Sequence, residues 1–419
     1  MRRIAGRERS DSSSTATADW MKRILAFVLL FALCLLGGCA KQPSYFVEFT
    51  LSQNAYSQGV KLSQSQLSEL RGEISELLHE IESQVSTEIE GSDLSRINAA
   101  AAGEEIEVGE HTAAMLEICS RLYERTGGAF SPALYNLSQL WGFTPEFEGK
   151  YSVPRPEPSA EAIAEALADS SFADIEINGN VVVKHNGAVK LDLGGIAKGY
   201  MSDCVRELIG QKYPDYCGTF SVMSNAVLMG QKQEDTAGLG YTATLENPRA
   251  QVTGGASPNG ALYFTGLSDT AVSTSADNYR FYVYGDTFYK HIIDPFTGKP
   301  SQNGVISITV LVPLSQENAG ALADACSTAG FCMPLTDALE FYRSLWEECG
   351  IGAVILTSDF CYEVIGNYHV LQPKEYAALV RPELADSVEN VFTLREVEAT
   401  DTVVPDEREK EYISLFTEK

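Results

Sequence analysis

The fold of this chain is organised around the stretch VKLDLGGIAKGY at residues 189–200. A β-branched run at 181–183 and an Asn-Gly turn at 186–187 precede it, which predicts a hairpin. After the glycines, apolar residues recur at helical spacing. Gly194 and Gly195 allow close approach to the backbone, the helix start offers N–H groups, and Lys198 adds a positive charge. The stretch therefore predicts a strand, a glycine turn and a helix that cradle a diphosphate; an ordinary turn with a surface lysine is the alternative.

The N-terminus indicates export. Met21 begins a Met-Lys-Arg start, which an apolar run at 24–36 and Gly-Gly-Cys at 37–39 follow. The run is too short to span a membrane and has the form of a secretory signal peptide. Cys39 resembles the lipid-modified cysteine of a bacterial lipobox. We expect residues 1–38 to be a signal peptide with an over-extended start, and the mature protein to be an extracytoplasmic lipoprotein anchored to the membrane at Cys39.

Composition excludes several classes of protein. The chain has 57 acidic and 31 basic residues, a net charge of −26, which argues against nucleic acid as a partner. Of nine cysteines, one lies in the signal and one is Cys39; the other seven lack CxxC spacing, which argues against a disulfide framework and a zinc site. A phosphate-bearing ligand must therefore be held by local donors or by a divalent cation.

Periodicity predicts an α+β chain. Helices are expected at 67–85, 112–125, 160–168, 319–330 and 335–349, and β-structure at 217–290 and in a hairpin of 353–356 with 361–365. We expect a mixed or antiparallel sheet flanked by helices, forming a single large two-lobed domain at residues 51–371 behind a lipid-anchored tether at 39–50. Residues 372–419 are acidic and aperiodic, and we expect only 388–401 of this C-terminal extension to be ordered.

Three further motifs carry candidate chemistry. Asp324 and Thr328 are four residues apart in a predicted helix, so a carboxylate and a hydroxyl share one face and suit Mg²⁺. His291, in KHIIDPFTG at 290–298, is a candidate acid or base, or a phosphate-orienting group. The stretch AVSTSAD at 271–277 offers hydroxyl donors. Each also has a plain alternative: a solvated helix face, a hydrogen-bonded strand end and an ordinary turn.

These motifs, in this order, resemble the ApbE family of FAD:protein FMN transferases. The earlier pieces SDLSRIN at 92–98, GGAF at 127–130 and LWGF at 140–143 match too, so the resemblance spans roughly residues 85–365. It implies an ApbE-like fold and a Mg²⁺-dependent reaction in which a threonine hydroxyl of an acceptor protein attacks FAD, AMP leaves and FMN stays attached. FMN-binding subunits of membrane redox complexes are the acceptors that the resemblance implies.

The resemblance also implies roles for individual residues. The metal would be held by Gly195 through its carbonyl, by Asp324 and by Thr328, and His291 would assist proton transfer or fix the phosphate. FAD would be contacted by a larger set: Asp192, Lys198, Ala129, Phe130, Ser131 and Ile292.

Four positions depart from the family pattern. Phe296 stands where the family usually has arginine, and Ser131 stands where it commonly has aspartate. The stretch that begins at Met223 replaces a usual Gly-Gly pair, and Glu88 replaces a residue that is usually aromatic. Three alternatives therefore stay open: a Mg²⁺-dependent FAD pyrophosphatase, a non-catalytic flavin-binding lipoprotein, and a solute-binding lipoprotein, which the β-rich second half disfavours.

Overall fold

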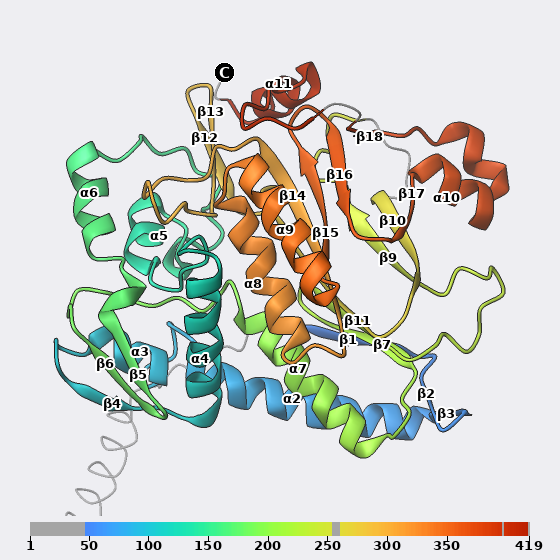
Figure 1. Cartoon of the computed structure of the whole chain (residues 1–419), viewed down its shortest axis with the longest axis horizontal. Helices are drawn as coiled ribbons and strands as arrows, with labels where there is room; N and C mark the ends of the chain where they lie inside the picture. Colours follow the sequence, from blue (N-terminus) through green and yellow to red (C-terminus); the bar gives the residue numbers. More distant parts are fainter. Residues whose placement is uncertain (1–46, 254–259, 396–397, 418–419) are drawn as a thin grey trace, which may run out of the picture. The chain divides into compact units, whose positions relative to one another are not determined.

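The computed structural model describes residues 47–253, 260–395 and 398–417 (Figure 1). From residue 47 onward the chain forms one compact unit. The predicted signal peptide, Cys39 and most of the tether lie outside the described residues. In the described ranges, no helix combines the length and the apolar character needed to cross a membrane.

An eight-stranded sheet is the centre of this unit. All neighbouring strands in it are antiparallel except the last pair, so the predicted mixed sheet and the α+β class are confirmed. The strands, in spatial order, are β1 (Phe49–Leu51), β7 (Gly218–Val222), β8 (Asn225–Met229), β11 (Thr270–Ala276), β14 (Val305–Pro313), β15 (Gly352–Thr357), β16 (Cys361–Ile365) and β18 (Thr393–Leu394).

Helices cover one face of this sheet. Residues of β14 at 308, 310 and 312 pack with α7 and α8 in the main core, because alternate side chains of a strand point to the same face. The other helices of this layer add apolar stripes to the same core. The layer comprises α2 (Gln64–Val85), α4 (Glu110–Arg125), α7 (Ala197–Lys212), α8 (Ala319–Phe331) and α9 (Leu335–Cys349).

A small sheet covers the opposite face. Its strands are β17 (His369–Leu371), β10 (Gly260–Leu267) and β9 (Tyr241–Glu246). Phe264 of β10 packs in a second core with Leu311 and Ile306 of β14. Ile306 lies on this face, unlike 308, 310 and 312, because the register of β14 is irregular between Val305 and Ser307. Because β14 is covered on both faces, it is a nearly continuous apolar run and not an alternating one.

The first part of the chain adds a small lobe of short elements. They are α3 (Asp93–Ala99), β4 (Glu105–Glu107), α5 (Tyr135–Trp141), η1 (Pro145–Phe147), α6 (Ala160–Ala168), η2 (Phe172–Asp174), β5 (Ile175–Asn178) and β6 (Val181–Lys184). The strands β2 (Tyr56–Ser57) and β3 (Val60–Lys61) form a separate hairpin, which a bridge from Tyr56 joins to Cys217 just before β7. The Trp141 indole N–H donates to the Gly298 carbonyl at 2.8 Å. This bond joins two of the motifs found in the sequence.

The predicted hairpin before the glycine turn is wrong. Strand β6 pairs with β4 and β5, and residues 189–193 form no strand. The Asn98 carboxamide instead makes both hydrogen bonds to the backbone of Leu191, at 2.7 and 2.9 Å. A side chain 93 residues away thus takes the place of a neighbouring strand, and no local pattern reveals that.

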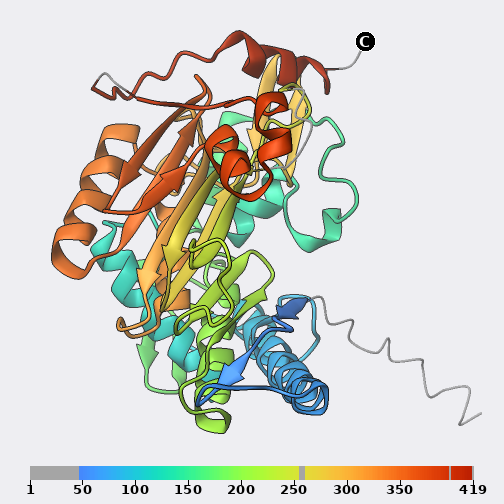
Figure 2. The ribbon, with the colours of Figure 1, turned by 90° about the vertical axis from the view of Figure 1, so that its right-hand side faces the viewer.

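The C-terminal segment is more ordered than expected. It forms α10 (Pro373–Val380), η3 (Pro382–Ser387) and α11 (Glu407–Ser414), drawn in red in Figures 1 and 2. Tyr376 of α10 stacks on Tyr263 of β10, with ring centroids 3.9 Å apart. Helix α11 packs its apolar side on a hairpin formed by β12 (Phe281–Tyr284) and β13 (Thr287–Lys290).

A buried group of four charges fixes α11 in place. The guanidinium of Arg249 is fully buried and binds Asp277 through two bonds, at 2.7 and 2.9 Å, and Glu409 through two more, at 2.6 and 2.8 Å. Lys290 Nζ lies 3.5 Å from Asp277. Two positive and two negative charges thus balance in the interior, where an unpaired ion is costly.

Replacing Glu409 tests this arrangement. Glu409→Gln leaves Arg249 and Lys290 with one carboxylate between them, so we expect the free energy of unfolding to fall by about 3 kcal/mol. Glu407→Gln is the matched control, because Glu407 lies on the same helix, exposed, and pairs only with Lys410; its effect should stay below about 0.5 kcal/mol. Denaturant unfolding measures both, and equal effects would show that the buried charges do not hold α11.

Helices α7 and α8 touch at Gly199 and Gly320, where a Cβ on either residue would overlap the other's carbonyl oxygen. Gly199→Ala should therefore force two rigid backbones apart and lower stability by about 2–3 kcal/mol. Gly210→Ala, on the same helix with nothing within 4 Å of the added methyl, should raise it by about 0.5–1 kcal/mol. Thermal and denaturant unfolding of the two variants compares them; a neutral Gly199→Ala would contradict the close contact.

Candidate functional site

The start of α7 is folded by its own side chains. Asp192 Oδ1 accepts a hydrogen bond from the Gly194 amide at 2.7 Å, and Lys198 Nζ donates to the Gly194 carbonyl at 2.7 Å. The amides of residues 194, 196, 197 and 199 all donate to acceptors within the protein. The prediction of an open row of N–H groups is therefore wrong for these four, and Lys198 supplies the positive charge of this turn.

Asp324 of α8 is buried beside this turn, with 3% of its surface exposed. Its Oδ2 accepts a hydrogen bond from the Gly199 amide at 3.0 Å and lies 3.2 Å from Lys198 Nζ. Its Oδ1 receives one long hydrogen bond, 3.4 Å from Ser273 Oγ. Since a carboxylate accepts about four bonds, Oδ1 keeps capacity for a cation or another donor.

Thr328 lies one turn further along α8, next to the glycine turn. A Cβ placed on Gly195 would lie 3.6 Å from the Thr328 hydroxyl oxygen and 3.4 Å from the Phe130 ring. Strand β11 supports the same helix face, because Ser275 Oγ lies 2.7 Å from Ser327 Oγ and 3.4 Å from the Thr328 hydroxyl. The structure thus brings together Gly195, Asp324 and Thr328 from two elements about 130 residues apart in the chain.

These three residues are suited to a hard cation. They offer a carbonyl, a carboxylate and a hydroxyl, all oxygen donors of the kind that Mg²⁺ uses while it keeps several waters. In the described part of the chain, no group of three or more His, Cys, Asp or Glu side chains could hold a metal. The donor set and the under-used Asp324 Oδ1 therefore fit a partly hydrated Mg²⁺ better than a metal held by protein ligands alone.

His291 follows β13 and contacts Arg280, which precedes β12. The His291 amide donates to the Arg280 carbonyl at 3.0 Å, and Nδ1 lies 3.2 Å from the same oxygen. A carbonyl only accepts, so Nδ1 carries the proton of the neutral ring and Nε2 keeps its lone pair. Burial, followed by the positive charges of Arg280 and Lys198, lowers the pKa of His291 to about 3. The ring is thus a neutral proton acceptor at physiological pH.

Among the remaining predicted FAD contacts, the segment at 129–131 adjoins the glycine turn, because the Asp192 amide donates to the Pro132 carbonyl at 2.7 Å. Ala129 and Phe130 are buried, and the Phe130 ring faces Gly195. The Ser131 hydroxyl accepts a hydrogen bond from the Ala133 amide at 3.3 Å, and the Ile292 carbonyl accepts one from the Ser301 amide at 2.9 Å. The role of Asp192 and of these four residues in binding FAD stays a prediction, because no contact in the structure tests it.

The departures from the family pattern lie in three different surroundings. Phe296 is 59% exposed, and its ring packs near Gly128. Met223 is 48% exposed and takes a left-handed backbone, φ 51°, in the turn between β7 and β8. Burial, with the charges of Glu148 and Glu146, raises the pKa of Glu88. Two of these positions therefore expose apolar side chains, and Glu88 stands in an acidic cluster with Glu146 and Glu148.

Two contributors to the site were missed from the sequence. Ser327 bonds to Ser275 and to the Asp324 carbonyl, the latter at 2.8 Å, and so ties α8 to β11. Its place three residues after Asp324, on the same helix face, was the available signal. Arg280 had no such signal, because its link to His291 depends on the pairing of β12 with β13.

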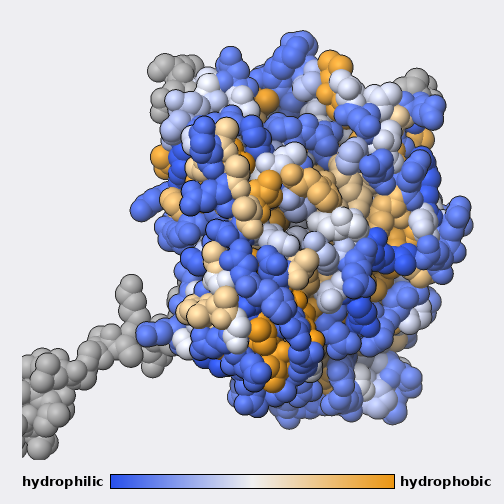
Figure 3. Space-filling view, turned by 60° about the vertical axis from the view of Figure 1, so that its left-hand side comes forward, coloured by the Kyte–Doolittle hydropathy of each residue, from blue (hydrophilic) through white to orange (hydrophobic). Residues whose placement is uncertain are grey.

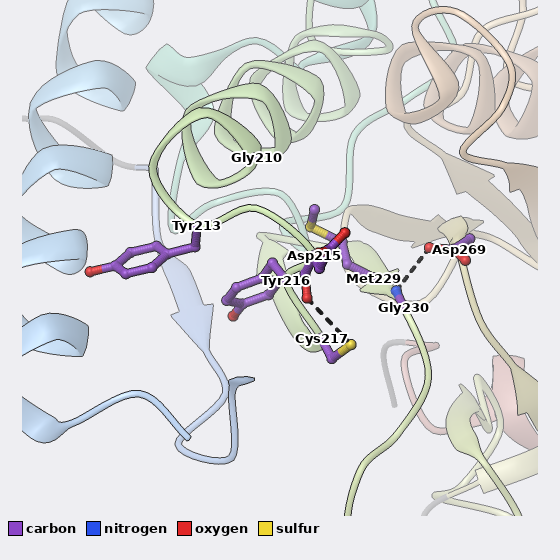
Figure 4. Close-up of a pocket in the computed structure, with 8 residues that line it drawn as sticks. All are labelled: Gly210, Tyr213, Asp215, Tyr216, Cys217, Met229, Gly230 and Asp269. Atoms are coloured by element: carbon purple, nitrogen blue, oxygen red, sulfur yellow. Dashed lines mark hydrogen bonds between the residues drawn. The ribbon is translucent and has the colours of Figure 1, made fainter. Parts of the chain in front are cut away.

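Other surface features lie apart from this site. Figure 4 shows a pocket of about 430 Å³ near the end of α7, lined among others by Gly210, Tyr216 and Met229 and by none of the predicted site residues. Hydrophilic residues predominate on the face drawn in Figure 3, and apolar ones gather in small patches near its middle. The pocket is therefore separate from the candidate site, which we identify from the contacts among its residues and not from a cavity.

Comparison with known proteins gives consistent matches. The model of the ApbE family matches residues 47–354. An FAD:protein FMN transferase of Vibrio cholerae is 29% identical over 289 residues, which cover 68% of this chain and 81% of that protein. One of Treponema pallidum is 31% identical over 268 residues, 62% of this chain and 71% of that protein. The crystal structure of the ApbE protein of Thermotoga maritima has a TM-score of 0.62 and 27% identity, covering 76% of this chain and 97% of that one.

The low pKa of His291 leads to a direct test. Between about pH 3 and the ordinary value of about 6.5, the unfolded chain binds a proton that the folded protein excludes. The His291 contribution to stability is therefore complete above about pH 6.5 and is lost progressively as the pH falls toward 3. NMR of the imidazole protons, assigned with His291→Gln, should show a neutral ring from pH 8 to 5. A titration of His291 with its midpoint near pH 6.5 would contradict the lowered pKa and the environment inferred for this ring.

Proposed function

Because the chain belongs to the ApbE family, we propose that it is an FAD:protein FMN transferase that works with Mg²⁺ on proteins outside the cytoplasm. Its relatives in Vibrio cholerae and Treponema pallidum carry that enzyme name. The observation that supports the proposal most is the junction of Asp324 with the glycine turn, through the Gly199 amide and Lys198. A site for splitting a diphosphate needs a cation ligand and a phosphate-binding turn in one place.

Gly195, Asp324 and Thr328 would hold the cation. When bound, Mg²⁺ neutralises negative charge on diphosphate oxygens and orients them. The buried position of Asp324 keeps its carboxylate fixed, because Lys198 and the Gly199 amide hold one oxygen while the other faces Ser273 with capacity to spare. Little reorganisation is then needed when the substrate arrives.

The reaction replaces the phosphoanhydride bond of FAD with a phosphoester bond to the acceptor. The threonine hydroxyl of the acceptor forms a bond to the phosphorus of the FMN half of FAD, and the bond to the AMP phosphate oxygen breaks. The hydroxyl proton passes to His291 Nε2, whose lone pair is available because Nδ1 holds the other proton against the Arg280 carbonyl. AMP leaves, and the acceptor keeps FMN through a phosphoester.

The compartment and the acceptor are parts of the same proposal. The signal-like segment and Cys39 support an extracytoplasmic lipoprotein anchored to a bacterial membrane. Acceptors are then FMN-binding domains of membrane redox complexes that present a threonine on the same side of the membrane.

Intact-mass measurement tests the reaction. We expect the purified protein, mixed with FAD, Mg²⁺ and an FMN-binding domain, to release AMP. The mass of the acceptor domain should increase by that of FMN less one water. Asp324→Ala should abolish the gain, and His291→Ala should reduce the rate by about 10²–10⁴-fold, the usual contribution of a general base. The exposed variant Glu407→Gln is the control.

Two other outcomes decide between the alternatives. Rapid, complete conversion of FAD to FMN and AMP without an acceptor would favour a pyrophosphatase. Tight FAD binding with no mass gain on any acceptor would favour a flavin reservoir, and either result would overturn the proposed transfer.

A further inference from the structure

Arg280 is an exposed arginine without an acidic partner in the part of the chain that the structure describes. The chain carries 57 acidic residues against 31 basic ones, so the binding of an anionic ligand depends on local cations. Lys198, the other cation whose charge acts on His291, is already paired with Asp324 at 3.2 Å. Arg280 is thus a cation next to His291 that, unlike Lys198, forms no ion pair with a carboxylate of the described residues.

Two contacts hold Arg280 in place. Its carbonyl receives the hydrogen bond of the His291 amide and faces Nδ1 of the same residue. Its guanidinium lies over the ring of Tyr151, 5.3 Å from the centroid, at a distance typical of cation–π attraction. The aromatic face limits the freedom of a long side chain without neutralising its charge.

Tyr151, over which the guanidinium lies, is within electrostatic range of the glycine turn. The pKa of Tyr151 is raised by burial and by the charges of Glu148, Glu88 and Asp192, and is lowered by Arg280. Asp192 belongs to the glycine turn, and Glu88 and Glu148 belong to the acidic cluster. Arg280 thus supplies a positive charge close to His291 and Tyr151, while the other charges that act on Tyr151 are negative.

We propose that Arg280 binds phosphate oxygens of the FAD diphosphate and that Tyr151 positions its guanidinium for this contact. A planar guanidinium can donate two parallel hydrogen bonds to a phosphate, which an ammonium cannot do. Because Lys198 is occupied by Asp324 and the Gly194 carbonyl, a second cation is needed beside the metal ligands. This assignment rests on the proposed function, since it takes FAD as the ligand.

Binding measurements separate the phosphate contact from other roles. Isothermal titration of the full protein with FAD, AMP and riboflavin should give at least a tenfold weaker Kd for FAD in Arg280→Gln. Riboflavin, which has no phosphate, should bind unchanged. The Kd of Arg280→Lys for FAD should lie between those of the wild-type protein and Arg280→Gln. The difference in FAD affinity between these proteins should shrink at high ionic strength, because the contact is partly exposed.

Matched variants complete the test. Tyr151→Leu should weaken FAD binding several-fold while riboflavin binding stays unchanged, and Tyr151→Phe should keep most of the affinity. Arg343→Gln, an exposed arginine on α9, removes the same charge and should change neither ligand. Thermal unfolding of each variant verifies that it is folded.

The possible failures are distinguishable. Wild-type affinity for FAD in a folded Arg280→Gln protein would overturn this inference and leave the transferase proposal intact. An equal loss of riboflavin and FAD binding would also overturn the phosphate assignment. Failure of the wild-type protein to bind FAD would overturn the proposed function itself.

Discussion

The site depends on the contact between the Asp324 carboxylate and the Gly199 amide. That hydrogen bond forms only because α7 and α8 approach closely where Gly199 meets Gly320, a crossing that no larger residue allows. The same approach sets Thr328 beside Gly195 one turn further along. The crossing of the two helices and the position of the predicted metal ligands thus both depend on one small contact area. Ser273 and Ser275 of β11 support the same part of α8 from the sheet.

Charge is divided between the interior and the candidate site of this acidic chain. The interior charges of Arg249 and Lys290 are balanced by Asp277 and Glu409. At His291, burial is the main cause of the lowered pKa, and the positive charges of Arg280 and Lys198 add to it. An anion bound beside those cations would oppose their field and raise that pKa again. Under the proposed function, the binding of FAD would therefore make His291 a stronger proton acceptor.

Local chemistry made much of this structure predictable. Helix α9 and helix α6 have the expected bounds, since each is amphipathic and ends at a clear boundary. The pairing of Asp324 with Thr328 followed from helical spacing. Long-range contacts were not predictable: Asn98 replaces a strand at Leu191, and Arg249 meets Glu409 from 160 residues away. Such contacts leave no periodic signal, because each is made by one polar side chain.

The most distant contribution to the site comes from the end of the chain. Arg280 and His291 face each other at the base of the β12–β13 hairpin, so the hairpin sets how the two residues are presented. Helix α11 packs Tyr412 against Phe281 and Phe288 of that hairpin and places Glu409 on Arg249. This helix lies beyond residues 47–354, which match the family model. A segment outside the matched region thus braces the hairpin that Arg280 and His291 flank, so the acidic tail supports the position of both residues.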